Sequence, residues 1–371
     1  MSVGTLVGLL KDEWFLTISA ATAVVFLLYD KCLLGNLDNR AWLILILAWL
    51  LAVMLGSALS VVRHADRLAE RLGEPYGTLI LTLSVTSIEV MSISAVMMHG
   101  ANNPTLVRDT LFAVVMIVMN GMVGLSLLFG ALRHREQSYN LQGANAYLSV
   151  VIPLAVLTMI LPDFTVTTSG PTLSRAQQIV LALTSAGLYA AFLGIQTGRH
   201  RGYFALVDEK HAKLRAAPNA SRPMAFHAIM VAAYLLPVIF LSEKLAVPVD
   251  YLIETLNVPV AFGGAIMAIL VATPEAIGAV RAATANHLQR SVNIFLGSVL
   301  STIGLTVPAM IVVSFITGRQ IALGLQHTDQ VMLVLTLTVS ILTFANGRTN
   351  VLQGAVHLIL FVTYVLLMFQ G

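Results

Sequence analysis

Two glutamates lie inside stretches of sequence that are otherwise apolar or small. Glu275 follows Pro274 within the run from Val260 to Val280, and Glu89 lies in the middle of the run from Tyr76 to Met97. A charged side chain at the centre of a membrane-spanning helix costs about 2.5 kcal/mol or more, so it marks a functional site by default. The two glutamates together predict an ion-binding site inside a membrane.

The proline beside Glu275 should affect the helix that carries it. We expect this helix to break or kink just before Glu275, because proline has no amide hydrogen and its ring clashes with the carbonyl one turn earlier. The carbonyls freed near Leu270 and Val271 would suit a cation, as they do in the broken helices of transporters. The stretch around Glu89 contains no proline, so any irregularity there should be milder.

Hydroxyl and amide side chains could complete an oxygen cage around the glutamates. The candidate cation-coordinating residues are Thr86, Ser87, Asn120, Thr273, Ser298 and Ser301. Such hard oxygen donors, with no cysteine and no mid-membrane histidine among them, suit Ca²⁺ or Na⁺ better than zinc or copper. The metal ions expected here are transported substrates, and we expect no cofactor.

Two carboxylates match the charge of one divalent ion or of two protons. Burial favours the neutral carboxyl group, whereas a bound cation favours the carboxylate, so cations and protons should compete for one site. A single buried glutamate can also serve as a hydrogen bond between helices. Two glutamates in corresponding halves of the chain make that simpler role a weaker explanation.

The composition is that of a membrane protein. The 371 residues are 57% hydrophobic and 11% charged, whereas soluble domains carry about 25% charged residues. The single cysteine, Cys32, excludes an intrachain disulfide and a thiolate metal cluster. The net charge of +3 does not suggest a nucleic-acid partner.

Apolar windows of about 20 residues predict eleven spanning helices. They lie near Trp14–Tyr29, Ala41–Val62, Tyr76–Met98, Thr110–Leu132, Ala144–Leu161, Ala176–Thr197, Ala225–Val247, Val260–Ala282, Val292–Thr317, Val331–Ala345 and Val351–Phe369. The first lacks a cleavage pattern of small residues, so we interpret it as a retained helix and not as a secretory signal.

Lysine and arginine distribute unevenly between the two sides of this arrangement. Of the 21 basic residues, 15 fall on the side of the N-terminus and 6 on the other side. Because basic residues accumulate in cytoplasmic loops, the N-terminus should be cytoplasmic and, with an odd number of spans, the C-terminus should lie outside.

The spans group into two halves. We expect an extra helix in residues 1–40, a first five-helix repeat in 41–198, a cytoplasmic linker in 199–223 and a second five-helix repeat in 224–371. An odd number of spans per repeat forces the second copy to insert upside down. The predicted fold is an all-α polytopic membrane protein with two inverted repeats. The polar linker could bind anionic lipid or a regulatory partner, although a simple connection would look the same.

The polar segment before the Glu89 span is predicted to be a short amphipathic cytoplasmic helix. Its His64, Asp66 and Glu74 could form a cytoplasmic ion entrance or a pH sensor, and a solvated surface helix is the simpler interpretation. We interpret His227 and His357, near predicted span ends, as ordinary interfacial or bundle residues.

Several motifs, in order along nearly the whole chain, resemble those of one family. They are Val61-Val-Arg-His-Ala-Asp66, Gly73-Glu-Pro-Tyr-Gly-Thr-Leu-Ile-Leu-Thr-Leu-Ser-Val85 with Glu89, Arg108-Asp-Thr110, Pro274-Glu275, Leu288-Gln-Arg290, Gly297-Ser-Val299 and Gly347-Arg-Thr-Asn-Val-Leu352. With these motifs the chain resembles the bacterial calcium/proton antiporters of the calcium/cation antiporter superfamily.

The resemblance implies an antiporter of the bacterial inner membrane with two inverted five-helix repeats and one leading helix. It also implies that Glu89 and Glu275 bind the exchanged cation, with Ca²⁺, Na⁺ and H⁺ as ionic partners and lipid as surroundings. Many superfamily members place Gly-Asn a few residues before each acid, where this chain has Val85-Thr86 and Val271-Ala272. Because Ala272 supplies no side-chain oxygen, export of Na⁺ or K⁺ with little Ca²⁺ transport is the alternative function.

Two other classes of function fit less well. An intramembrane enzyme would need a nucleophile with its base, a zinc motif or a Gly-x-Ser-x-Gly turn, and we find none of these. A passive cation channel would not need the inverted repeats, which favour alternating access.

Overall fold

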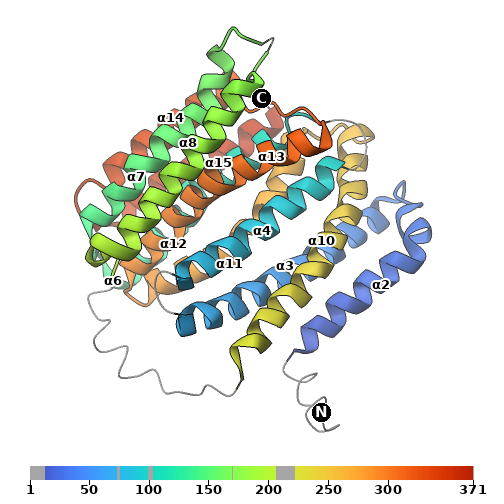
Figure 1. The fold of residues 1–371 in the computed structure, drawn as a ribbon, viewed down its shortest axis with the longest axis horizontal. Coiled ribbons are helices and arrows are strands. Elements are labelled where there is room, and N and C mark those ends of the chain that lie inside the picture. The colour runs from blue at the N-terminus through green and yellow to red at the C-terminus, as the bar shows by residue number, and fades with distance from the viewer. Residues whose placement is uncertain (1–12, 73–75, 99–102, 169, 206–221, 371) are drawn as a thin grey trace. The chain divides into compact units, whose positions relative to one another are not determined.

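The computed structural model describes residues 13–72, 76–98, 103–168, 170–205 and 222–370. These residues are almost entirely helical (Figure 1). Among the described residues, ten helices or continuous helical runs are long enough and apolar enough to cross a membrane. The chain is therefore a polytopic α-helical membrane protein, as predicted.

The α-helices, in chain order, are α2 (Trp14–Leu34), α3 (Arg40–Leu72), α4 (Tyr76–Met98), α5 (Leu106–Met116), α6 (Val123–His134), α7 (Leu141–Ala155), α8 (Arg175–Gly194), α10 (Met224–Glu254), α11 (Ala261–Thr284), α12 (Leu288–Ser301), α13 (Val307–Thr317), α14 (His327–Thr343) and α15 (Val351–Gln370). Wider π-helical turns are η1 (Ile117–Met122), η2 (Val156–Ile160), η4 (Ile195–Arg199) and η6 (Thr302–Thr306). Short 3₁₀ helices are η3 (Leu161–Phe164) and η5 (Arg201–Tyr203), and β1 (Gln137–Ser138) pairs antiparallel with β2 (Arg348–Thr349).

Two details differ from the sequence expectations. Residues 63–72 are the last turns of α3 and not a separate helix, because they are rich in helix-forming Arg, Ala, Leu and Glu. The predicted span from Val331 corresponds to α14, whose 17 residues are shorter than the other ten spans. At 1.5 Å per residue α14 measures about 26 Å, slightly less than a hydrocarbon core.

Of the break or kink expected just before Glu275, the break does not occur, and a kink stays a prediction. The helix α11 continues through this residue from Ala261 to Thr284. A proline removes one backbone hydrogen bond, and membrane helices tolerate this where neighbouring helices support them. Here α11 packs against α5, α6 and α12, so packing outweighs the local effect of the proline.

The chain divides into two compact units. Unit 1 contains α2, α3, α4 and α10, and Figure 1 shows the yellow α10 running alongside the blue α3. Buried serines join these helices: the Ser19 and Ser57 hydroxyls lie 2.8 Å apart between α2 and α3, and Ser242 of α10 donates to Ser92 of α4 at 3.0 Å. Unit 1 therefore combines helices from both predicted halves of the chain.

Unit 2 contains α5 to α8 and α11 to α15, with the π-helical turns between them. Gly264 lets α11 approach α5 closely. A Cβ atom added at this glycine would lie 2.7 Å from the carbonyl carbon of Asp109 and from the amide nitrogen of Thr110. Neither backbone atom can move without shifting α5, so the contact positions the helix that carries Glu275.

We expect Gly264→Ala to lower the stability of the protein by about 1–3 kcal/mol, the usual cost of overpacking. The matched control is Gly187→Ala in α8, where an added Cβ atom meets nothing within 4 Å. Alanine is the better helix former by up to about 1 kcal/mol, so this control should be neutral or stabilising. Thermal unfolding of the purified variants provides the measurement, and equal melting temperatures would contradict the close contact.

Candidate functional site

Glu89 lies on a buried polar stripe of α4. Its side chain is 1% exposed, and Thr86 and Ser92 lie three residues before and after it, on the same helix face. Within the described part of the chain, the buried Thr86 hydroxyl has no hydrogen-bond partner. A buried hydroxyl without a partner is costly, and its place one turn from a carboxyl group fits a ligand for a cation.

Glu275 is hydrogen-bonded by the next helix. Ser298 of α12, itself buried, donates its hydroxyl to Oε2 of Glu275, and Ser301 donates to the Ser298 carbonyl oxygen at 2.9 Å. The structure thus brings two predicted ligands, Ser298 and Glu275, into contact. A hydroxyl that donates to a carboxylate stabilises its charged form, which is the form that binds a cation.

Two other predicted ligands are bonded within their own helices. Ser87 donates to the Leu83 carbonyl oxygen at 2.6 Å, and Thr273 donates to the Ile269 carbonyl oxygen at 2.6 Å. Bonds to the carbonyl four residues earlier are the usual local partners of serine and threonine in helices. Their role as cation ligands stays a prediction.

Asn120 lies at the centre of a buried network in unit 2. Its Nδ2 donates to the Thr336 hydroxyl at 2.9 Å, and its Oδ1 lies 3.3 Å from Nδ1 of His357. The other ring nitrogen, Nε2, lies 2.9 Å from the Thr343 hydroxyl. The four side chains are at most 3% exposed, so the network fixes the Asn120 amide, and cation coordination by Asn120 stays a prediction.

The sequence interpretation of His357 as an ordinary interfacial or bundle residue did not include its polar partners. Its side chain is fully buried in α15. A titratable side chain inside an apolar span is the signal that could have pointed to a buried polar network.

Irregular turns accompany both glutamate helices. Each glutamate helix is followed by a helix with a π-helical segment, η1 after α4 and η6 after α11. η1 contains Asn120, and η6 begins directly after Ser301. Such turns interrupt the regular backbone bonding and are frequent at functional sites.

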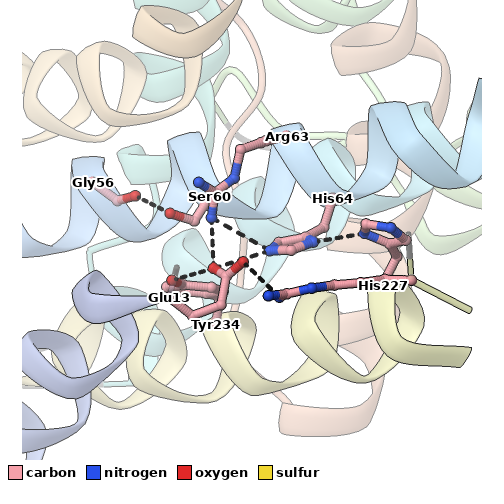
Figure 2. Close-up of polar contacts among 8 residues, drawn as sticks. Glu13, Gly56, Ser60, Arg63, His64, His227 and Tyr234 are labelled. Carbon is pink, nitrogen blue, oxygen red and sulfur yellow. Dashed lines mark hydrogen bonds and ion pairs between the residues drawn. The ribbon is translucent and has the colours of Figure 1, made fainter. Parts of the chain in front are cut away.

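The predicted entrance residue His64 is buried in unit 1, and Figure 2 shows its ring between Glu13 and His227. Its Nε2 lies 3.3 Å from the Glu13 carboxylate, and its Nδ1 lies 2.9 Å from Nδ1 of His227. Arg63 and Tyr234 also donate to Glu13, at 2.6 Å and 3.0 Å. We call these five side chains the Glu13 cluster; it joins the start of α2 to α3 and α10. Glu13 was not among the candidate residues of the sequence analysis.

Asp66 and Glu74 are the other two entrance candidates. Asp66 is half-buried on α3, and Glu74 lies outside the described residues. An ion entrance formed by these residues stays a prediction.

Comparison with known proteins identifies the family to which the chain belongs. The family model described as "Sodium/calcium exchanger protein" matches residues 42–198 and 226–370. The chain belongs to the sodium/calcium exchanger family. This family consists of membrane transporters that exchange cations, so the protein is a cation antiporter by family.

Two bacterial relatives match most of the exchanger chain. A putative ionic transporter, y4hA, of Sinorhizobium fredii is 43% identical over 317 residues, covering 85% of this chain and 86% of the relative. The sodium-potassium/proton antiporter ChaA of Escherichia coli is 42% identical over 320 residues, with the same coverage of 85% and 86%.

Solved structures share the exchanger fold at lower identity. Native YfkE superposes with a TM-score of 0.73 at 19% identity, covering 96% of this chain and 100% of that one. The H⁺/Ca²⁺ exchanger CAX gives a TM-score of 0.62 at 14% identity, with 96% and 88% covered. These similarities show the fold.

Removing the Ser298 hydroxyl should weaken cation binding at Glu275. A hydrogen bond to a charged group contributes about 1.5–3 kcal/mol, so Ser298→Ala should raise the half-saturating cation concentration about tenfold or more at neutral pH. Thr338→Ala is the control, because the Thr338 hydroxyl donates to the Val334 carbonyl in its own helix. Cation-dependent exchange in vesicles measures both, and an unchanged half-saturating concentration in Ser298→Ala would contradict the role of this bond.

Replacing His357 tests the Asn120 network. His357→Leu leaves the Asn120 amide and the Thr343 hydroxyl without their ring partner, which should cost about 1–3 kcal/mol for each buried group. His357→Gln keeps one donor and one acceptor and should retain more of the stability. Melting temperatures distinguish the two, and equal losses would show that ring packing outweighs the hydrogen bonds.

Proposed function

We propose that this protein is a secondary antiporter that exports Ca²⁺ in exchange for protons, with Na⁺ or K⁺ as additional substrates. The observation that carries the proposal is a carboxyl group in each of two membrane helices, each with a hydroxyl beside it. Glu89 has Thr86 one turn away, and Glu275 accepts a bond from Ser298. Groups of this kind bind a cation when charged and carry protons when neutral.

Exchange follows from the electrostatics of these carboxyl groups. Without a cation, burial favours protonation, because an unpaired charge in a medium of low dielectric is unstable. A cation that binds the carboxylates expels the protons, and returning protons release the cation. Glu89 and Glu275 would each alternate between these forms, so no separate proton path is required.

The direction of transport rests on the predicted topology. With the N-terminus in the cytoplasm of a bacterial cell and the protein in its inner membrane, protons entering from outside would drive cations out. Two inverted five-helix repeats would supply the alternating access. The match of one family model to two separate segments of the chain supports this arrangement.

A monovalent-cation antiporter with little Ca²⁺ transport is the second candidate function. The relative named a sodium-potassium/proton antiporter, 42% identical to this chain, favours it. Ala272, three residues before Glu275, is buried and offers no side-chain oxygen. A site with fewer oxygen ligands suits a monovalent ion better than Ca²⁺, which takes 6–8 ligands.

Inside-out vesicles with an acidic lumen and a lumenal pH dye test both functions. Adding the transported cation should raise the lumenal pH, and Ca²⁺, Na⁺ and K⁺ added in turn identify the substrate. Glu89→Gln and Glu275→Gln should each abolish the response, because an amide neither carries a proton nor neutralises a cation. Glu243→Gln is the matched control, since Glu243 is 55% exposed beside Lys244.

A response that persists in a Glu89→Gln, Glu275→Gln double variant would overturn the proposal. A response to Na⁺ and K⁺ without a response to Ca²⁺ would favour the second candidate function.

A further inference from the structure

A basic cavity opens beside the Glu13 cluster in unit 1. Its volume is about 210 Å³, and three arginines line it: Arg63, Arg67 and Arg222. The rings of His64, His227 and Phe226 form other parts of the wall, and Glu13 is the one acidic residue among the described residues of the lining. Guanidinium groups gathered in this way are suited to phosphate, which they bind through paired hydrogen bonds.

The Glu13 carboxylate forms hydrogen bonds and ion pairs within the protein. Its carboxylate accepts from Arg63 at 2.6 Å and from Tyr234 at 3.0 Å, and Arg222 lies 4.0 Å away. Among the described residues of the lining, one carboxylate faces three arginines, so these residues are basic on balance. Arg67 also pairs with Glu70 at 3.3 Å, but both side chains are more than 60% exposed, and such surface pairs are weak.

The arginines remain accessible to a ligand from outside. Arg63 and Arg67 are 52% and 61% exposed, and Arg222, 26% exposed, stacks over the Phe226 ring at 4.6 Å. Stacking helps to hold the Arg222 guanidinium in place.

Most of the residues that line the cavity lie at the ends of the apolar stretches of α3 and α10. On α3 the apolar run ends at Val62, directly before Arg63, and α10 begins at Met224, two residues after Arg222. Trp14, Leu59 and Met224 are exposed apolar side chains close to the cavity lining in the sequence. Tryptophan and arginine at such a boundary are typical of the headgroup level of a bilayer, and basic pockets between membrane helices bind lipid phosphates.

We propose that this cavity binds the phosphate of an anionic phospholipid. Arg67 and Arg222 hold the phosphate oxygens, and the acyl chains lie along the exposed apolar side chains near Trp14 and Leu59. A lipid bound here contacts α3 and the start of α10, which the Glu13 cluster already joins. The proposal does not depend on which cation the protein transports.

Native mass spectrometry of the purified full-length protein tests this site. The protein is exposed to phosphatidylglycerol or to phosphatidylcholine, and the retained lipid is counted. We expect one phosphatidylglycerol to be retained in preference to phosphatidylcholine. In an Arg67→Gln, Arg222→Gln variant its affinity should fall about 25-fold, since each basic residue near a membrane surface contributes about a factor of five. Arg133→Gln, which removes an exposed arginine at the end of α6, should retain the lipid as the wild type does.

Three results would overturn the proposal: equal retention of both lipids, unchanged retention in the double variant, or displacement of phosphatidylglycerol by millimolar inorganic phosphate. The last result would identify free phosphate as the ligand. If the double variant does not fold, Arg67→Gln alone provides the test, because this side chain is 61% exposed and leaves the Glu13 cluster intact. The single variant should lose about fivefold in affinity for phosphatidylglycerol, and no loss would contradict the site.

Discussion

The cost of keeping a carboxyl group inside a membrane constrains the rest of this structure. Glu89 is 1% exposed, and Glu275 accepts a hydrogen bond from a buried serine. An uncompensated carboxylate in such surroundings is unstable, so each glutamate must hold a proton or a cation, or lie beside polar groups that stabilise its charge. In the proposed function, this constraint is the reason that cations and protons compete for the two glutamates.

Hydroxyl groups and close helix packing position the two glutamates, and neither glutamate helix is interrupted. Ser242 ties α10 to α4 one turn beyond Glu89, and Gly264 brings α11 against the backbone of α5. The helix α11 is continuous through Pro274. Irregular backbone occurs instead in the helices that come after α4 and after α11, as η1 and η6. Close packing at small residues and hydrogen bonds between side-chain hydroxyls are the usual interactions that hold membrane helices together.

Local patterns in the sequence predicted the helical membrane fold and included Glu275 and Ser298 among the candidate ligands, because apolar runs and the polar residues within them are visible in short windows. Their contact is seen only in the structure. The partners of the polar clusters were not predicted. Glu13 meets Tyr234 across 221 positions of the chain, and Asn120 meets His357 across 237. Such contacts depend on which helices pack together. The effect of Pro274 was overestimated for the same reason, since tertiary packing supports α11 where local propensity does not.

Competition between protons and cations at the two glutamates is the central claim of this account, and proton release on cation binding measures it most directly. The purified protein would be placed in weakly buffered detergent solution with a pH indicator, and Ca²⁺, Na⁺ or K⁺ would be added at constant ionic strength. The account predicts release of protons in proportion to the protein, saturating with the cation that is transported and absent from a Glu89→Gln, Glu275→Gln variant. Saturable binding of that cation with no release of protons would contradict it.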